Sequence, residues 1–285
     1  MAGTYNNLYL NARKRLRAVG VEEDQLEALE LICHASGKTR EEFLRDRGFY
    51  ASGEIEERME WLLRRREAGE PVPYLIGEWD FYGMSLDVDN GVLIPRPDTE
   101  VLAQRAIACA QQVKESCRVL DLCAGSGCVG LAVAKRVAGC RVLLADVSDD
   151  ALRVARRNVR KTGLRGQVGC ERVNALELPP RGVGTFDVIA CNPPYIRRAE
   201  LETLDISVRE FEPLLALDGG EDGLDFYRAV TSDWRTALRR GGVLLFEVGY
   251  DQADSVIALM EKRGFREIQT HRDGQGIRRV VEGHL

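Results

Sequence analysis

The chain has 285 residues, 45% of them hydrophobic and 30% charged, and its formal net charge is −5 at pH 7. This length allows one large domain and a smaller one, and the composition is ordinary for a soluble globular protein. The acidic balance argues against non-specific binding to nucleic acid phosphates. With no apolar signal-peptide core and no apolar run of membrane-spanning length, we expect a cytoplasmic protein that does not bind membranes.

The cysteine and histidine contents narrow the possible chemistry. The eight cysteines include no C-x-x-C pair, which indicates reduced, packed thiols rather than a disulfide framework or a zinc site. We therefore expect no bound metal. Two of the three histidines lie near the C-terminus, and a reaction that depends on a histidine base is not expected.

The first quarter of the chain differs in pattern from the rest. Apolar residues recur at helix spacing up to about residue 70, with glycines between the segments and almost no strand signal. We predict a helical N-terminal domain over residues 1–75. Apolar and polar residues then alternate at 84–88, which predicts a β-hairpin linker over residues 76–92.

Over residues 93–285, expected strands and helices alternate, as they do in parallel α/β sheets. The expected strands lie at 118–122, 141–145, 167–173, 185–191, 242–248, 265–271 and 277–283. The predicted fold class is therefore α/β, with a Rossmann-like, mostly parallel seven-stranded sheet after the small helical domain.

A glycine-rich turn follows the first of these strands. Gly125, Gly127 and Gly130 satisfy G-x-G-x-x-G, a pattern that lets the backbone approach a ligand at a helix N-terminus. The glycines alone are compatible with an NAD site or with a purely structural turn. Asp121 precedes the turn, where it would repel a pyrophosphate but suits a cationic amino acid group. Asp146 ends the next strand and suits a ribose, so we predict S-adenosyl-L-methionine as the cofactor.

The fourth expected strand ends in an unusual way, with Asn-Pro-Pro-Tyr directly after an apolar run. The side-chain oxygen of Asn192 and the carbonyl of Pro193 are two acceptors on a rigid backbone, suited to hold both N–H bonds of an –NH₂ group. Tyr195 offers an aromatic face for a planar substrate group. This arrangement predicts methylation of a planar nitrogen, although a Pro-Pro turn capped by Asn has the same sequence.

These motifs resemble those of the bacterial peptide chain release factor N(5)-glutamine methyltransferases, the PrmC/HemK family. The Asn-Pro-Pro-Tyr motif is shared with adenine-N6 methyltransferases, whereas "PRPDTE" is more discriminating. The likeness covers most of the chain, with matching segments at 69–83, 92–100, 121–127, 146–148, 192–196, 212–228, 246–252 and 273–281.

The resemblance implies a class I S-adenosylmethionine-dependent methyltransferase fold with S-adenosyl-L-homocysteine as the product. It also implies that the helical domain helps to dock a release factor, whose Gly-Gly-Gln glutamine is methylated. Asn192, Pro193 and Tyr195 would be catalytic. The cofactor-binding residues it implies are Asp121, Leu122, Cys123, Ala124, Gly125, Gly127, Asp146, Asn174 and Asn192, and the substrate-binding residues are Asn192, Pro193, Pro194 and Tyr195.

The chain departs from the family pattern at several of these positions. Cys123 and Ala124 stand where the family often has Gly and Thr. Asn174, expected to contact the adenine amino group through its side-chain oxygen, replaces the favoured Asp. Arg96 and Thr99 are expected to close the site from the linker, although Thr99 is equally suited to cap the helix that starts there.

Three other functions remain open on the sequence. An adenine-N6 methyltransferase acting on DNA or RNA would use the same Asn-Pro-Pro-Tyr segment on a flipped base, but the acidic charge and the absence of a basic reading domain argue against direct nucleic acid binding. A glutamine methyltransferase of a ribosomal protein and a non-catalytic nucleotide-binding scaffold are the others. We expect a monomer whose partners are release factors.

Overall fold

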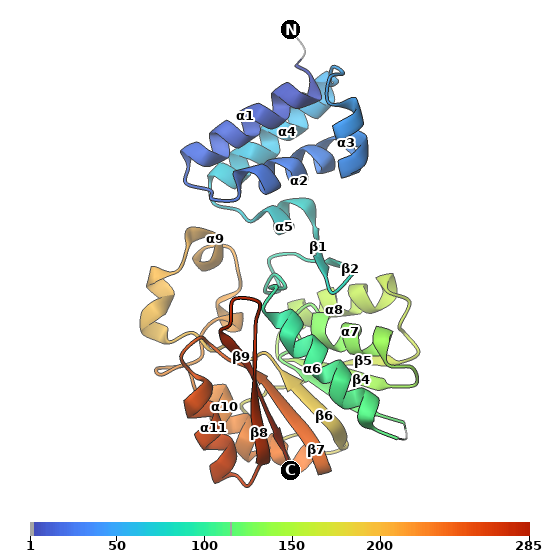
Figure 1. Ribbon diagram of the computed structural model, residues 1–285, viewed down its shortest axis with the longest axis vertical. Helices are drawn as coiled ribbons and strands as arrows, with labels where there is room; N and C mark the ends of the chain where they lie inside the picture. The colour runs from blue at the N-terminus through green and yellow to red at the C-terminus, as the bar shows by residue number, and fades with distance from the viewer. Residues whose placement is uncertain (1–2, 115) are drawn as a thin grey trace. The chain divides into compact units, whose positions relative to one another are not determined.

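The structure is a computed structural model that describes residues 3–114 and 116–285 (Figure 1). The chain forms two compact units. The first extends to Gly77 and also contains Asp205–Phe211, and the second consists of Glu78–Leu204 and Glu212–Leu285. In the described residues, no helix combines the length and apolar character that crossing a membrane requires.

The first unit is helical, as the apolar spacing predicts. Its helices are α1 (Tyr5–Ala18), α2 (Asp24–Ser36), α3 (Arg40–Asp46), α4 (Gly53–Glu67), α5 (Val72–Ile76) and α9 (Ile206–Arg209). The side chains of Thr4, Thr39 and Ser52 accept hydrogen bonds from backbone N–H groups in the first turns of α1, α3 and α4. Such caps satisfy donors that have no partner within the helix, and they explain where these helices begin.

The second unit holds a two-stranded hairpin and a seven-stranded sheet. The hairpin strands are β1 (Glu78–Phe81) and β2 (Met84–Asp87), and the sheet strands are β3 (Arg118–Leu122), β4 (Arg141–Asp146), β5 (Val168–Arg172), β6 (Phe186–Cys191), β7 (Leu238–Glu247), β8 (Arg266–Arg272) and β9 (Arg278–His284). The sheet order is β5-β4-β3-β6-β7-β9-β8, and only the pairs of β9 are antiparallel.

The expected strands are confirmed with one correction. The strand expected at 242–248 begins at Leu238, four residues earlier, despite the glycines at 241 and 242. Leu238 pairs with Phe186, and the Arg239 guanidinium donates to the Asp187 carboxylate at 2.7 Å. These contacts with the neighbouring strand extend the ladder where sequence pattern alone indicates a turn.

Helices cover both faces of the sheet (Figure 1). One face packs on α6 (Thr99–Gln112), α7 (Cys128–Arg136) and α8 (Asp149–Lys161), and the other on α10 (Asp225–Ser232) and α11 (Ala253–Lys262). Alternate residues of β3 point to opposite faces: Val119 belongs to the first core, and Leu120 to the second. A strand covered on both sides reads as a continuous apolar run, so a polar residue within it requires a specific reason.

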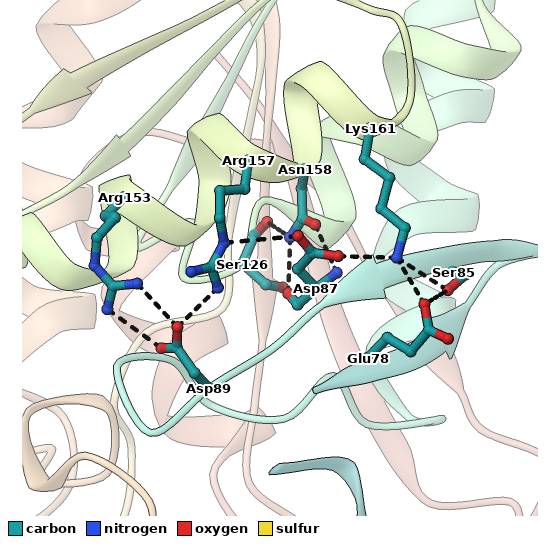
Figure 2. A network of polar contacts seen from close by, with 9 residues as sticks. All are labelled: Glu78, Ser85, Asp87, Asp89, Ser126, Arg153, Arg157, Asn158 and Lys161. Carbon is teal, nitrogen blue, oxygen red and sulfur yellow. Dashed lines mark hydrogen bonds and ion pairs between the residues drawn. The ribbon is translucent and has the colours of Figure 1, made fainter. Parts of the chain in front are cut away.

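The hairpin is tied to α8 and to the glycine-rich turn by one buried amide, Asn158 (Figure 2). Its Nδ2 donates to the carbonyls of Asp87 (3.0 Å) and Ser126 (2.9 Å), and its Oδ1 accepts from the N–H of Asp87 (2.7 Å). Two ion-pair groups in more exposed positions add to this junction: Lys161 pairs with Glu78 and Asp87, and Arg153 pairs with Asp89. Asn158 thus holds the turn after β3 in register with the hairpin.

We expect Asn158→Ala to lower the free energy of unfolding by about 3 kcal/mol, because one buried and two partly buried hydrogen bonds to backbone groups are lost. The control is Arg153→Ala, which removes a half-exposed ion pair and should cost less than about 1 kcal/mol. Urea denaturation of both variants measures the difference. Equal losses would mean that the buried amide does not organise this junction.

Candidate functional site

The parallel strands β3, β4, β6 and β7 end at the same edge of the sheet, where strand order reverses between β3 and β6. Ligands of such sheets bind outside this edge, at the switch point. A cleft lies there and brings together ten of the residues expected from the sequence. These are Arg96, Thr99, Asp121, Cys123, Ala124, Gly125, Asp146, Asn174, Asn192 and Pro194.

Four expected residues do not line this cleft: Leu122, Gly127, Pro193 and Tyr195. Leu122 is fully buried in the core of the sheet. The Tyr195 ring is half-buried beside the same core, and its backbone carbonyl accepts from Gln252 Nε2 at 2.9 Å. The aromatic group therefore flanks the cleft rather than lining it.

The glycine-rich turn is held to β4 by two hydrogen bonds. The N–H of Ala124 donates to the carbonyl of Ala145 (3.0 Å), and that of Gly125 to Asp146 Oδ2 (2.9 Å). A Cβ atom at Gly125 would meet no other atom within 4 Å, whereas one at Gly130 would lie 2.4 Å from Leu144 Cδ2. Gly125 therefore faces the open cleft, and Gly130 is needed for the close packing of α7 on β4.

Asp121 is a buried carboxylate within the central strand. Only 2% of the residue is exposed, and Oδ2 accepts from the N–H of Gly130 at 2.8 Å. Burial, with a smaller contribution from the nearby Asp146, raises its pKa to about 8 against the opposing effect of the hydrogen bond from Gly130. An acid that resists ionisation in a cleft is suited to pair with a cationic ligand.

Asp146 is already engaged by the backbone. Besides the Gly125 bond, Oδ1 accepts from the N–H of Ser148 at 2.9 Å, and burial raises the pKa of the carboxyl. Each carboxylate oxygen has a second acceptor position, so Asp146 can accept two hydroxyl donors while it holds the turn. Its role in positioning the turn is not visible in the sequence, because it depends on a contact across 21 residues.

Asn192 follows β6, and its side chain has a defined orientation. Nδ2 donates to the hydroxyl of Thr99 at 3.3 Å. Thr99 is 2% exposed and is the first residue of α6, whose N-cap position is occupied by Asp98; the expected capping role of Thr99 is therefore wrong. Because Thr99 takes the amide N–H, Asn192 Oδ1 is directed away from it and is available as an acceptor.

Asn174 is engaged within its own loop. Oδ1 accepts from the N–H of Leu176 at 3.0 Å, and Nδ2 donates to Glu177 at 2.9 Å. A local turn of this type explains why a polar residue follows β5. One acceptor position of Oδ1 remains for a ligand in the cleft.

Two buried glutamates near the site were missed by sequence reasoning. Glu212 is 5% exposed, forms an ion pair with Arg96 and accepts from the N–H of Ile94 at 3.2 Å. It anchors the segment that carries Arg96 along the cleft. Glu247 ends β7, is 2% exposed and has its pKa raised to about 7 by burial. A charged residue at the end of an apolar strand was the signal that could have identified Glu247.

Known protein families match both units of the chain. Residues 7–77 match the PrmC N-terminal domain, and residues 99–211 match the methyltransferase small domain. The chain is similar to the solved structure of a methyltransferase from Pyrococcus furiosus, with a TM-score of 0.51 at 17% identity, covering 72% of this chain and 90% of that one. At this identity the likeness concerns the fold alone.

Relatives with a named activity are more similar in sequence. The release factor glutamine methyltransferase of Agrobacterium fabrum is 36% identical over 95% of this chain and 93% of its own. That of Clostridium acetobutylicum is 39% identical over 77% of this chain and 76% of its own. The similarity to the Agrobacterium protein therefore extends over both units.

The turn contains a strained residue whose replacement tests its conformation. Cys123 has φ 62°, a left-handed conformation that costs a non-glycine residue roughly 1–2 kcal/mol. We expect Cys123→Gly to raise the free energy of unfolding by about 1 kcal/mol, because glycine adopts this region without strain. Ala124, which does not have a positive φ, is the control: Ala124→Gly should lower stability by about 0.5–1 kcal/mol. Thermal unfolding would contradict the assignment if both changes lowered stability alike.

Proposed function

The chain belongs to the release factor glutamine methyltransferase family, and on this premise we propose that it methylates the side-chain amide nitrogen of the glutamine in the Gly-Gly-Gln motif of peptide chain release factors, with S-adenosyl-L-methionine as methyl donor. The observation that carries the proposal is the position of Asn192. It places a free amide oxygen at the edge of a cleft that also contains the glycine-rich turn and two buried acids.

The residues of the cleft fit the proposed cofactor. Asp121 is a buried acid with no ion-pair partner among the described residues, which suits the ammonium of an amino acid moiety. Asp146 has acceptor positions for a ribose diol, and the open face of Gly125 allows close approach of a ligand. When bound, the cofactor supplies a methyl group on a cationic sulfur, and the acids of the cleft are compatible with that charge.

The chain's own residues orient the substrate amide. A planar amide nitrogen is a weak nucleophile because its lone pair is delocalised, so positioning contributes more than a strong base does. We assign one N–H bond of the glutamine side chain to Asn192 Oδ1 in the cleft, and the other to the carbonyl of Pro193, which adjoins Asn192 without lining the cleft. The rigid backbone of Pro193 and Pro194, both buried, limits the movement of these acceptors. Tyr195 flanks the substrate from the side of the sheet core.

We assign recognition of the intact release factor to the helical unit. Its core is complete by itself, with fully buried residues in α1, α2 and α4. Eight large apolar side chains on this unit are nevertheless more than a third exposed: Leu10, Val19, Leu26, Leu44, Phe49, Tyr50, Trp61 and Ile206. Exposed aromatic residues are frequent in protein interfaces, which supports docking of a protein partner here.

The proposed function predicts methyl transfer that depends on one glutamine and one asparagine. Labelled methyl groups should pass from S-adenosyl-L-methionine to a release factor, and not to the same factor with its Gly-Gly-Gln glutamine changed to alanine. Asn192→Ala should lower kcat about 10²–10³-fold, because one of the two orienting acceptors is lost.

Offered in the same assay, DNA, RNA and ribosomal proteins should remain unlabelled. Equal labelling of the two release factors would refute the proposed substrate. If the Asn192→Ala variant transfers methyl at the wild-type rate, the Asn-Pro-Pro-Tyr segment is a structural turn with no role in orienting the substrate.

Cofactor binding should depend on pH through Asp121. Its pKa is about 8 in the free protein, and a cationic ligand favours the ionised form, so below pH 8 binding must release a proton. Affinity should therefore rise about tenfold per pH unit between pH 5.5 and 7, where the amino group of the cofactor stays protonated. Calorimetry in buffers of different ionisation enthalpy measures the released proton. Asp121→Asn is the control and should bind more weakly, without this slope; a wild-type affinity independent of pH would contradict the assignment.

A further inference from the structure

Glu247 lies beside the proposed catalytic asparagine for a topological reason. Strands β6 and β7 are parallel, and Cys191 pairs with Phe246. Asn192 and Glu247 are the next residues of the two strands, so the register places them side by side at the carboxyl edge. Glu247 is 2% exposed, and its Oε2 has no hydrogen-bond partner among the described residues. A buried carboxylate with an unpaired oxygen costs stability, and its presence here requires an explanation.

The Glu247 carboxyl lies beside two polar side chains that favour its ionised form. Thr99 and Asn192 both lower its pKa, so their donor groups lie within reach of it, and Asn192 Nδ2 donates to Thr99 Oγ1 at 3.3 Å. An ionised carboxylate only accepts hydrogen bonds. Because the Thr99 oxygen accepts from Asn192, the Thr99 hydroxyl hydrogen is free to point toward Glu247, and the Nδ2 end of Asn192 faces this pair.

From this geometry we propose that Glu247 is a positioning residue, which holds the Asn192 amide with its oxygen toward the substrate. The inference rests on the proposed function, because it assigns Asn192 Oδ1 to the glutamine N–H. An amide can rotate by half a turn at little cost in shape, exchanging its acceptor for a donor. In that orientation Asn192 would present N–H to the substrate N–H, and the acceptor would be lost. Glu247 and Thr99 act only through Asn192.

The charge of Glu247 makes this orientation sensitive to pH. Burial and, to a smaller extent, Asp98 raise its pKa to about 7 against the opposing effects of Thr99, Arg279 and Asn192. Three other titratable side chains face the group: Tyr195 after β6, Cys128 at the start of α7 and Tyr227 on α10. When protonated, Glu247 can donate to Asn192 Oδ1 and stabilise the rotated amide. Methyl transfer should therefore decline as pH falls through about 7, with a dependence on one proton.

The test compares the pH profile of kcat in the wild-type protein and in Glu247→Gln, with cofactor and release factor both saturating so that titration of Asp121 does not contribute. In the wild type, kcat should fall as the pH drops below about 7, which gives the profile an acid limb. Glu247→Gln keeps the shape but both donates and accepts, so kcat should fall about ten- to a hundredfold. Its acid limb should be absent, and its affinity for the cofactor should change less than twofold.

Two further variants separate positioning from folding. Thr99→Val removes the hydroxyl between Asn192 and Glu247 and should lower kcat without altering cofactor affinity. Glu282 on β9 is also buried, but it is paired with Arg105 and His271, which hold its pKa low at about 2 against the effect of burial. Glu282→Gln should lower stability and leave the acid limb of kcat in place.

A readout independent of activity is the ¹⁵N resonance of the Asn192 side-chain amide. It should titrate near pH 7 in the wild type and not in Glu247→Gln. The positioning role is refuted if Glu247→Gln keeps the wild-type kcat, the fall of kcat on the acid side, or the titration of the Asn192 amide. The proposed function stands in that case, provided that the wild type methylates release factors. Loss of transfer by the wild type itself would instead refute the function.

Discussion

The burial of several carboxyl groups at one edge of the sheet is the constraint on which the site depends, because the surrounding structure must offset its cost in free energy. Asp121, Asp146 and Glu247 lie at or near the ends of three parallel strands, and among the described residues none has an arginine or lysine within ion-pair distance. Burial raises the pKa of each, whereas in more exposed positions arginine holds the pKa of acids such as Asp254 low. A site with excess buried acid costs stability when it is empty and gains most from a cationic ligand.

The glycine-rich turn is positioned by contacts from elements on both sides of it. Asp146 and Ala145 bind its backbone from β4, and Asn158 binds Ser126 from α8 while it also holds the hairpin. These bonds over-determine the turn, so that Cys123 remains in a left-handed conformation despite its cost. The hydrogen bonds of the surrounding elements therefore offset the backbone strain of a residue that faces the cleft. The hairpin is therefore part of the scaffold of the site, as well as the segment that follows the helical unit.

Orientation of a single amide links the fold to the proposed chemistry. The amide of Asn192 donates to a hydroxyl at the start of α6, and a buried carboxylate at the end of β7 lies beside it. The two groups come from elements 148 positions apart in the chain, Thr99 and Glu247. For a reaction on a poorly nucleophilic nitrogen, the direction of the acceptors matters as much as their presence. The proposed orientation of Asn192 therefore depends on two buried polar residues, Thr99 and Glu247.

The sequence by itself determined the alternation of strands and helices, the glycine-rich turn, the acids on either side of it and the Asn-Pro-Pro-Tyr segment, because each is encoded by local periodicity or backbone chemistry. It also indicated that these motifs meet, since parallel strands end at one edge. Tertiary structure alone decided the partners of each polar side chain. The bond from Gly125 to Asp146, the junction at Asn158 and the bond from Asn192 to Thr99 join residues far apart in the chain. Strand register and helix packing, rather than sequence spacing, bring such groups together, and their burial then sets their pKa values.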